Sequence, residues 1–180
     1  MDQRRVRIET YLNRLHGYAL SLAGDRDRAR DLVQDCALRA MAARRSPVDE
    51  PAYRAWLFRI LRNAYLDQER RAGRTQSLSD GHDQAPGDTQ IWRFDESLIS
   101  ALTVRIGLAR ISVAHREIIT LVDLVGFTYA ETAELIGVAP GTVMSRLCRA
   151  RHALLKAITE SNVQPLPIGI GTAQARKLAK

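Results

Sequence analysis

One stretch constrains the fold of this chain more than any other: "YAETAELIGVAPGTVMSRLCRAR", residues 129–151, in which two helical patterns meet at Gly137. Thr128, followed three residues later by Glu131, is typical of a capping box at a helix start. Gly137 favours a helix end, because glycine readily adopts the left-handed backbone found there. Pro140 suits the first turn of the next helix. The stretch therefore predicts either a helix-turn-helix that reads DNA or an αα-hairpin whose basic residues face water.

The second helix of this stretch combines an apolar stripe with a polar face. Its stripe is formed by Val143, Leu147, Ala150 and Leu154. At roughly 100° per residue, the opposite face and its flanks carry hydroxyl and guanidinium groups, which can hydrogen-bond base edges and phosphates. The candidate DNA contacts on this helix are Thr142, Ser145, Arg146, Arg149 and Arg151.

Charge and hydropathy narrow the functional class. The 180 residues carry 27 Lys plus Arg against 20 Asp plus Glu, so the net charge is +7, which suits a phosphate-bearing partner. No apolar run reaches the roughly 18 residues of a membrane span, and the N-terminus lacks a signal-peptide core. We expect a cytoplasmic protein without membrane insertion. Cys36 and Cys148 are too far apart in sequence for a clustered zinc site, so we expect reduced thiols and no metal.

The rest of the chain is helical in pattern, which predicts an all-α fold. Apolar stripes cover residues 8–22 and 29–41, with a break expected between them at Gly24 and Asp25. A third helix is expected over 52–71, with Pro51 at its start and Gly73 after its end. Residues 75–100 hold one Arg or Lys against five Asp or Glu, which indicates an acidic, flexible linker. The predicted organisation is two small helical domains at 1–74 and 97–160, a linker at 75–96, and a tail at 161–180 without an assigned role.

Nothing in the sequence favours an enzyme. The four histidines, His16, His82, His115 and His152, lie in separate segments, and no glycine-rich phosphate loop is present. We therefore predict no catalytic residue and no cofactor.

Three stretches in order resemble one family. They are "DRDRARDLVQDCALRAMAA", "YRAWLFRILRNAYLDQERRAGR" and "HREIITLVDLVGFTYAETAELIGVAPGTVMSRLCRARHALL". Together they resemble the bacterial sigma factors of the extracytoplasmic-function (ECF) group, which keep only conserved regions two and four of the larger sigma factors. The resemblance covers roughly residues 5–158. It implies an alternative transcription initiation factor that binds core RNA polymerase and promoter DNA, with a region-two bundle and a region-four helix-turn-helix.

The resemblance also implies roles for particular residues. Asp31, Gln34 and Asp35 would dock on the clamp helices of the polymerase, although solvated polar residues have the same pattern. The helix-turn-helix would read the minus-thirty-five element. The residues implied in recognising and opening the minus-ten element are Arg44, Arg45, Tyr53, Arg54, Trp56, Arg59, Arg62 and Asn63. Aromatic rings there can stack on an unpaired base, worth about 1–3 kcal/mol per base, but aromatics at helical spacing are more often core residues.

Regulation and alternatives follow from the same resemblance. Members of this group are commonly held inactive by an anti-sigma factor that covers both domains, so we expect such a partner and domains that move relative to each other when free. A stand-alone helix-turn-helix regulator is one alternative, but it leaves the DLVQD stretch unexplained. A sigma-mimicking adaptor that binds an anti-sigma factor is another, but it need not retain Arg146 and Arg149. Transcription with purified core polymerase separates the three.

Overall fold

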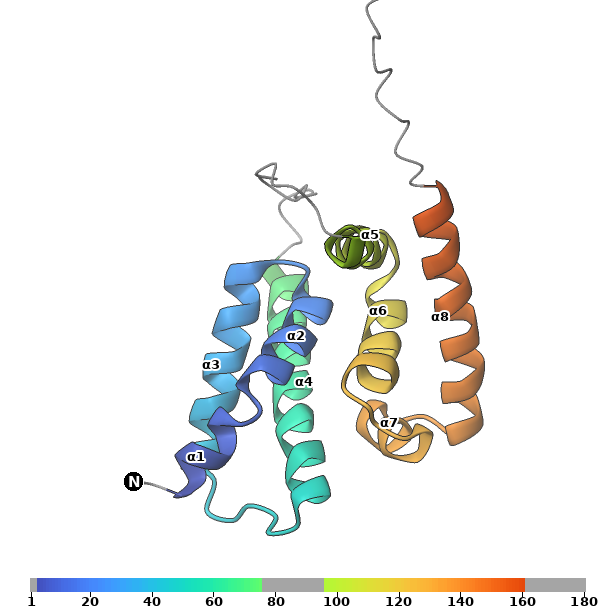
Figure 1. Cartoon of the computed structure of the whole chain (residues 1–180). Helices are drawn as coiled ribbons and strands as arrows, with labels where there is room; N and C mark the ends of the chain where they lie inside the picture. The colour runs from blue at the N-terminus through green and yellow to red at the C-terminus, as the bar shows by residue number, and fades with distance from the viewer. Residues whose placement is uncertain (1–2, 76–95, 161–180) are drawn as a thin grey trace, which may run out of the picture.

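The computed structural model describes residues 3–75 and 96–160, and all regular secondary structure in these ranges is helical. This confirms the all-α prediction. Figure 1 shows the helices in two groups, each a small bundle, lying side by side. The elements are α1 Gln3–Glu9, α2 Leu12–Ala23, α3 Arg26–Ala42, α4 Glu50–Thr75, α5 Glu96–Arg110, α6 Val113–Ile119, the π-helical turn η2 Thr120–Leu124, α7 Tyr129–Ile136 and α8 Pro140–Glu160.

Helices α1 to α4 form the first domain around an aromatic core. Gly24, with φ of 70°, ends α2, and its N–H donates to the Leu20 carbonyl. Asp25 then begins α3, because its carboxylate accepts the N–H of Arg28 at 2.8 Å. In the interior, the rings of Tyr18 and Phe58 lie 5.2 Å apart between centroids. The predicted break between two helices at Gly24 and Asp25 is confirmed.

One expectation for this domain was confirmed with a difference, and one was wrong. The stripe over residues 8–22 is buried as expected, but it is divided between α1 and α2, and the Tyr11 hydroxyl at the break donates to Glu50 at 2.6 Å. Gly73 does not follow the third helix but lies inside α4, which continues to Thr75. A glycine within a helix costs about 0.5–1 kcal/mol relative to alanine, which does not suffice to end the helix.

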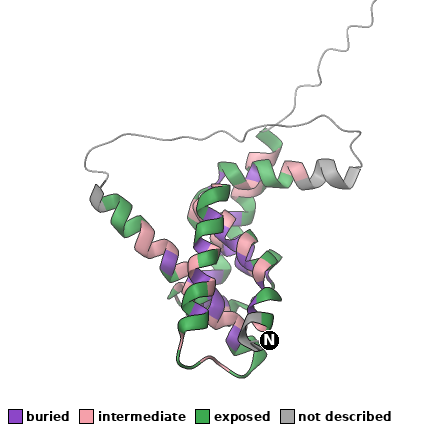
Figure 2. Ribbon diagram, turned by 90° about the vertical axis from the view of Figure 1, so that its left-hand side faces the viewer, coloured by how far each residue is buried: buried purple, intermediate pink, exposed green. Residues whose placement is uncertain are grey.

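Helices α5 to α8 form the second domain, whose core is smaller and aliphatic. Ser112 caps α6 by accepting the N–H of His115, and α6 continues directly into η2. Helix α5 approaches α8 closely, since a Cβ added at Gly107 would lie 2.7 Å from Ile158 Cγ1. Figure 2 shows buried residues gathered where the helices face one another. They are Ile111, Ile118, Ile119, Ala133, Val143, Leu147 and Ala150.

The two domains pack against each other. Helix α6 lies on α2, and α7 lies on α4. Phe127, between η2 and α7, meets the ring of Phe58 edge-on at 5.1 Å between centroids. Leu121, Val125 and Leu135 join Phe127 in the apolar cluster of the first domain. The expected linker lies almost entirely outside the described residues, and no helix within them is long and apolar enough to cross a membrane.

Candidate nucleic-acid and polymerase interfaces

The helix-turn-helix is formed by α7, the turn at Gly137 and α8. Thr128 and Glu131 make the reciprocal hydrogen bonds of the predicted capping box, and Gly137 ends α7 with φ of 75°. Helix α8 begins at Pro140, where the missing N–H has no cost. Each of these features was expected from the sequence, and each is confirmed.

The predicted DNA face of α8 is exposed to solvent. Val143, Leu147 and Ala150 are buried, so the stripe that holds the helix to its domain is confirmed, with Leu154 only partly covered. Ser145, Arg146 and Arg149 are exposed on the other side, and Thr142 is half-buried at its edge. Arg149 Nε donates to the Ser145 carbonyl at 3.3 Å, which leaves the rest of its guanidinium outward. This face can present donors to a DNA groove.

Arg151 makes a contact that the sequence did not suggest. Its guanidinium makes two hydrogen bonds to Asp123 of η2, at 2.6 and 3.1 Å. The hydrogen bond and the charge of Asp123 raise the pKa of Arg151 above its ordinary value. A two-pronged contact of this kind fixes direction as well as distance, so Arg151 ties the middle of α8 to the π-helical turn.

Three arginines of α4, Arg54, Arg59 and Arg62, face the second domain. Each is paired with a glutamate far away in sequence, across the boundary between the domains. The pairs are Arg54–Glu131 at 2.9 Å, Arg59–Glu134 at 2.7 Å and Arg62–Glu117 at 2.8 Å. Three of the arginines predicted to touch minus-ten DNA are thus paired within the chain, while Asn63 beside them is exposed.

The aromatic pair predicted to stack on bases divides between core and surface. Tyr53 is only 1% exposed, and the Arg7 guanidinium lies 3.8 Å from the centre of its ring. Tyr53 also packs on Tyr11, with 6.1 Å between ring centroids. A ring held in this way belongs to the core and is not available to a base in this arrangement. Trp56, 5.5 Å from Tyr53, is half-buried and keeps part of its ring at the surface.

Two groups of predicted residues in the first domain stand at its surface. Arg44 and Arg45 are exposed in the segment between α3 and α4. On α3, Asp31 and Gln34 are exposed. Asp35 is half-buried and forms an ion pair with Arg39 of the same helix at 2.8 Å, which partly neutralises its charge.

Next to the α3 polar residues, an apolar side chain is exposed: Leu38 is 67% exposed. Leu38 follows Gln34 by four residues, so the two share a face of the helix. This face combines acid, amide and apolar groups, as a protein-docking surface does. Leu38 was not singled out from the sequence, because an isolated exposed leucine is common.

Sequence reasoning also missed the acidic partners at the boundary between the domains. Glu117 accepts from both Arg62 and the hydroxyl of Tyr18, the latter at 2.9 Å. Burial, reinforced by the charge of Glu117, raises the pKa of Tyr18 well above its ordinary value. Burial alone would raise the pKa of Glu131, but its hydrogen bonds from Thr128 and Arg54 outweigh this, and the pKa is lowered. Glu131 is therefore ionised at neutral pH.

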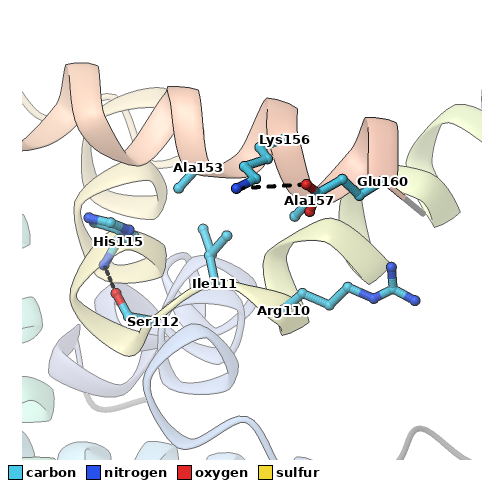
Figure 3. A pocket seen from close by; sticks show the side chains of 8 residues that line it. All are labelled: Arg110, Ile111, Ser112, His115, Ala153, Lys156, Ala157 and Glu160. Carbon is cyan, nitrogen blue, oxygen red and sulfur yellow. Dashed lines mark hydrogen bonds and ion pairs between the residues drawn. The ribbon is translucent and has the colours of Figure 1, made fainter. Parts of the chain in front are cut away.

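An open hollow of about 360 Å³ lies at the end of the second domain away from the turn of the helix-turn-helix. Figure 3 shows it between the end of α5, the start of α6 and the last turns of α8. Its polar groups largely satisfy each other: Lys156 pairs with Glu160 at 3.7 Å, and Ser112 caps His115. The hollow lies where the last turns of α8 pass over the connection between α5 and α6.

Comparisons with known proteins agree with this arrangement. Sigma-70 region 2 matches residues 7–75, and Sigma-70 region 4 matches residues 108–154. The chain is 36% identical over 158 residues to the ECF RNA polymerase sigma factor EcfG of Rhodopseudomonas palustris, covering 85% of this chain and 83% of that protein. It is 37% identical over 150 residues to the ECF sigma factor SigL of Mycobacterium tuberculosis, covering 81% and 83%.

A solved structure is similar in fold as well as in sequence. The sigma factor RpoE of Bartonella quintana, in complex with the anti-sigma factor NepR, superimposes with a TM-score of 0.67 at 30% identity, covering 89% of this chain and 99% of that one. Both domains of the present chain thus have counterparts in one protein family, and in the same order. By its two matched regions and its relatives, the chain belongs to the ECF RNA polymerase sigma factors, a family of DNA-binding transcription initiation factors and not of enzymes.

Proposed function

We propose that this chain binds bacterial core RNA polymerase, directs it to promoters by their minus-ten and minus-thirty-five elements, and assists strand opening. The observation that carries the proposal is the division of α8 into a buried stripe and an outward face with Ser145, Arg146 and Arg149. A helix held in this way can enter the major groove without disturbing its own domain. Strand opening would draw on binding energy within the polymerase complex.

The polymerase would dock on α3. Asp31 and Gln34 offer a charge and an amide beside the exposed Leu38. Such a surface fits a basic and partly apolar partner, because charge complementarity sets the orientation of binding and apolar contact strengthens it. Asp35 contributes less freely, since Arg39 already neutralises it.

The minus-ten element would be held by the end of the first domain that carries Arg44, Arg45, Trp56 and Asn63. These residues are at least partly exposed in the present arrangement. Basic side chains track the backbone of a separated strand, and an aromatic face holds an unpaired base. Arg54, Arg59 and Arg62 would join this surface when they are released from their glutamate partners.

An anti-sigma factor is proposed as the regulatory partner. The support is the likeness to RpoE of Bartonella quintana, whose solved structure is a complex with the anti-sigma factor NepR. In that pairing the present chain covers 99% of the sigma factor, so both of its domains are involved in the likeness.

The test is reconstituted transcription with the full chain, purified core polymerase and fragments of genomic DNA. Asp31→Arg places a positive charge at the proposed docking surface and should abolish most polymerase binding, since a like-charge contact at an interface costs several kcal/mol. Asp31 is preferred over Asp35 because Asp35→Arg would also repel Arg39 within α3.

The matched control is Glu160→Arg, which makes the same charge change at the far end of α8. It should leave polymerase binding unchanged. Normal core-polymerase affinity of Asp31→Arg would contradict the docking surface. A wild-type chain that binds promoter duplex without core polymerase, and starts no transcription with it, would instead favour a stand-alone regulator.

A further inference from the structure

The boundary between the domains has an unusual charge arrangement. Three arginines of one helix face three glutamates of the other domain, and all three guanidinium groups are within 3 Å of a carboxylate. The pairs, in order along α4, are Arg54–Glu131, Arg59–Glu134 and Arg62–Glu117. We call these three glutamates the acidic clasp. They lie on α6 and α7, the helices that pack on the first domain.

The three ion pairs of the clasp differ in their exposure to solvent. The Arg62 and Glu117 side chains are 20% and 14% exposed, whereas those of Arg59 and Glu134 are 47% and 75% exposed. The guanidinium carbon of Arg54 lies 4.4 Å from the ring centre of Phe127, so this arginine is sandwiched between a carboxylate and an aromatic face. Water screens the outer pair more than the inner ones.

Carboxylate and phosphate oxygens are equivalent partners for a guanidinium group, because both accept its paired N–H donors. We propose that the acidic clasp is an internal substitute for DNA phosphates: it occupies the α4 arginines in the closed chain and must be displaced before promoter DNA can use them. This inference rests on the proposed function, which assigns these arginines to the minus-ten element.

The acidic clasp does not satisfy every hydrogen-bond donor of the arginines. Arg54 binds Glu131 through Nη2, but its Nε is buried and has no hydrogen-bond partner among the described residues. A buried donor without an acceptor weakens the closed arrangement. Beside Arg54 the boundary is also open to solvent, in a hollow of about 470 Å³ lined by Arg14, Glu50 and Glu131 among others. These features favour a clasp that holds the closed state without locking it.

The size of the effect follows from population arithmetic. If only the open fraction of the chain binds DNA, the apparent affinity is reduced by that fraction. Three ion pairs of this exposure, each of modest strength, contribute a factor of about 3 to 30 to the closing constant, in addition to the apolar contact of Phe127 with Phe58. Removing the clasp charges should raise the apparent affinity for single-stranded DNA by that factor.

The test variant is the full chain with Glu117→Gln, Glu131→Gln and Glu134→Gln together. Glutamine keeps an acceptor for the Tyr18 hydroxyl and preserves the capping box of α7, in which Gln can replace Glu. The control replaces three acidic residues whose ion pairs stay within one domain: Asp27→Asn, Glu69→Gln and Glu160→Gln. Both variants gain the same net charge, so a general electrostatic gain in DNA affinity cancels in the comparison.

Two measurements are made on each protein. Small-angle X-ray scattering reports the radius of gyration at low and high salt, and fluorescence anisotropy reports binding of a labelled single-stranded DNA of mixed sequence. At low salt the clasp variant should have a larger mean radius of gyration than the control, because its open fraction is larger, and it should bind the probe about 3- to 30-fold more tightly. Wild type and control should be compact at low salt and expand as salt screens the pairs.

Equal dimensions and equal probe affinity of clasp variant and control would overturn the inference. Expansion without a gain in affinity would overturn it as well, because the freed arginines would then be no DNA site. Failure of the proposed function would show elsewhere, as an absence of core-polymerase binding by the wild-type chain, and would leave the scattering result standing.

Discussion

The two domains of this chain are stabilised in different ways. The first has interlocking rings, with Tyr18 and Phe58 fully buried at its centre. The second is held by a small set of aliphatic and alanine side chains, and part of its apolar surface, including Leu121 and Phe127, joins the core of the first domain instead. The comparison indicates that the second domain obtains part of its stability from its packing on the first domain.

The largest expected effect tests that dependence. Phe58→Ala should lower the free energy of unfolding by about 3–5 kcal/mol, because it opens a cavity in the aromatic core and removes the edge-on contact with Phe127. Denaturant unfolding followed by circular dichroism measures the loss. If the domains share stability, the second domain should loosen too.

Leu147→Ala is the counterpart within the second domain, where Leu147 is 1% exposed. It should cost about 2–4 kcal/mol and affect mainly that domain. Amide hydrogen exchange, measured helix by helix, shows whether each variant destabilises one domain or both.

If α6 and α7 are as protected in Phe58→Ala as in the wild type, the second domain does not depend on the first for stability, and the comparison fails.

The next effect concerns binding and not stability. Arg149→Ala should weaken binding of the minus-thirty-five duplex by about 1–3 kcal/mol if the guanidinium reads a base edge, and it should leave the unfolding free energy nearly unchanged because the side chain is exposed. Calorimetric titration with the promoter duplex and with a scrambled duplex provides the measurement. An equal loss for both duplexes would reassign Arg149 to a phosphate.

A pair of glycines compares the packing of the two domains at the scale of one methyl group. Gly107→Ala places a Cβ against Ile158 and Leu154 and should destabilise the second domain by about 1 kcal/mol or more. Gly17→Ala in α2 meets nothing within 4 Å and should stabilise the first domain by about 0.5–1 kcal/mol. Melting temperatures of the two variants should shift in opposite directions, and a shared direction would contradict this reading of the α5–α8 contact.

The smallest effect leaves the fold untouched and uses one thiol in each domain. Burial, reinforced by the charge of Asp35, raises the pKa of Cys36 to about 12, whereas Cys148 is exposed on α8. Because the thiolate is the reactive form, Cys148 should react with a disulfide reagent at neutral pH in the native protein. Cys36 should react only after the first domain unfolds. Two thiols titrating at the same rate in the native protein would contradict the burial of Cys36.

The parts of the fold that sequence predicted are those determined locally. The capping box at Thr128 and Glu131 and the helix end at Gly137 depend on residues a few positions apart, so their chemistry can be read directly from the chain. The same holds for Gly24 and Asp25. The outward face of α8 followed from helical periodicity alone.

What the sequence could not give depends on contacts between distant segments. Tyr11 donates to Glu50, which is 39 residues away, Arg7 packs on the ring of Tyr53, and Arg62 pairs with Glu117, which is 55 residues away. The continuation of α4 through Gly73 reflects cooperativity of a long helix over a single unfavourable residue. The candidate residues could thus be listed from the sequence, but the pairing of three of them with glutamates of the other domain could not.

The contact between Arg151 and Asp123 has a consequence for how the specificity of this chain can change. The guanidinium group of Arg151 links the middle of α8 to η2, in addition to the buried stripe that holds the helix to its domain. If α8 reads DNA as proposed, a substitution at Asp123 should change the angle at which the helix meets a groove while leaving every side chain on the outward face of α8 in place. The promoter preference of this chain could then change through a residue outside the recognition helix, as well as through new base contacts.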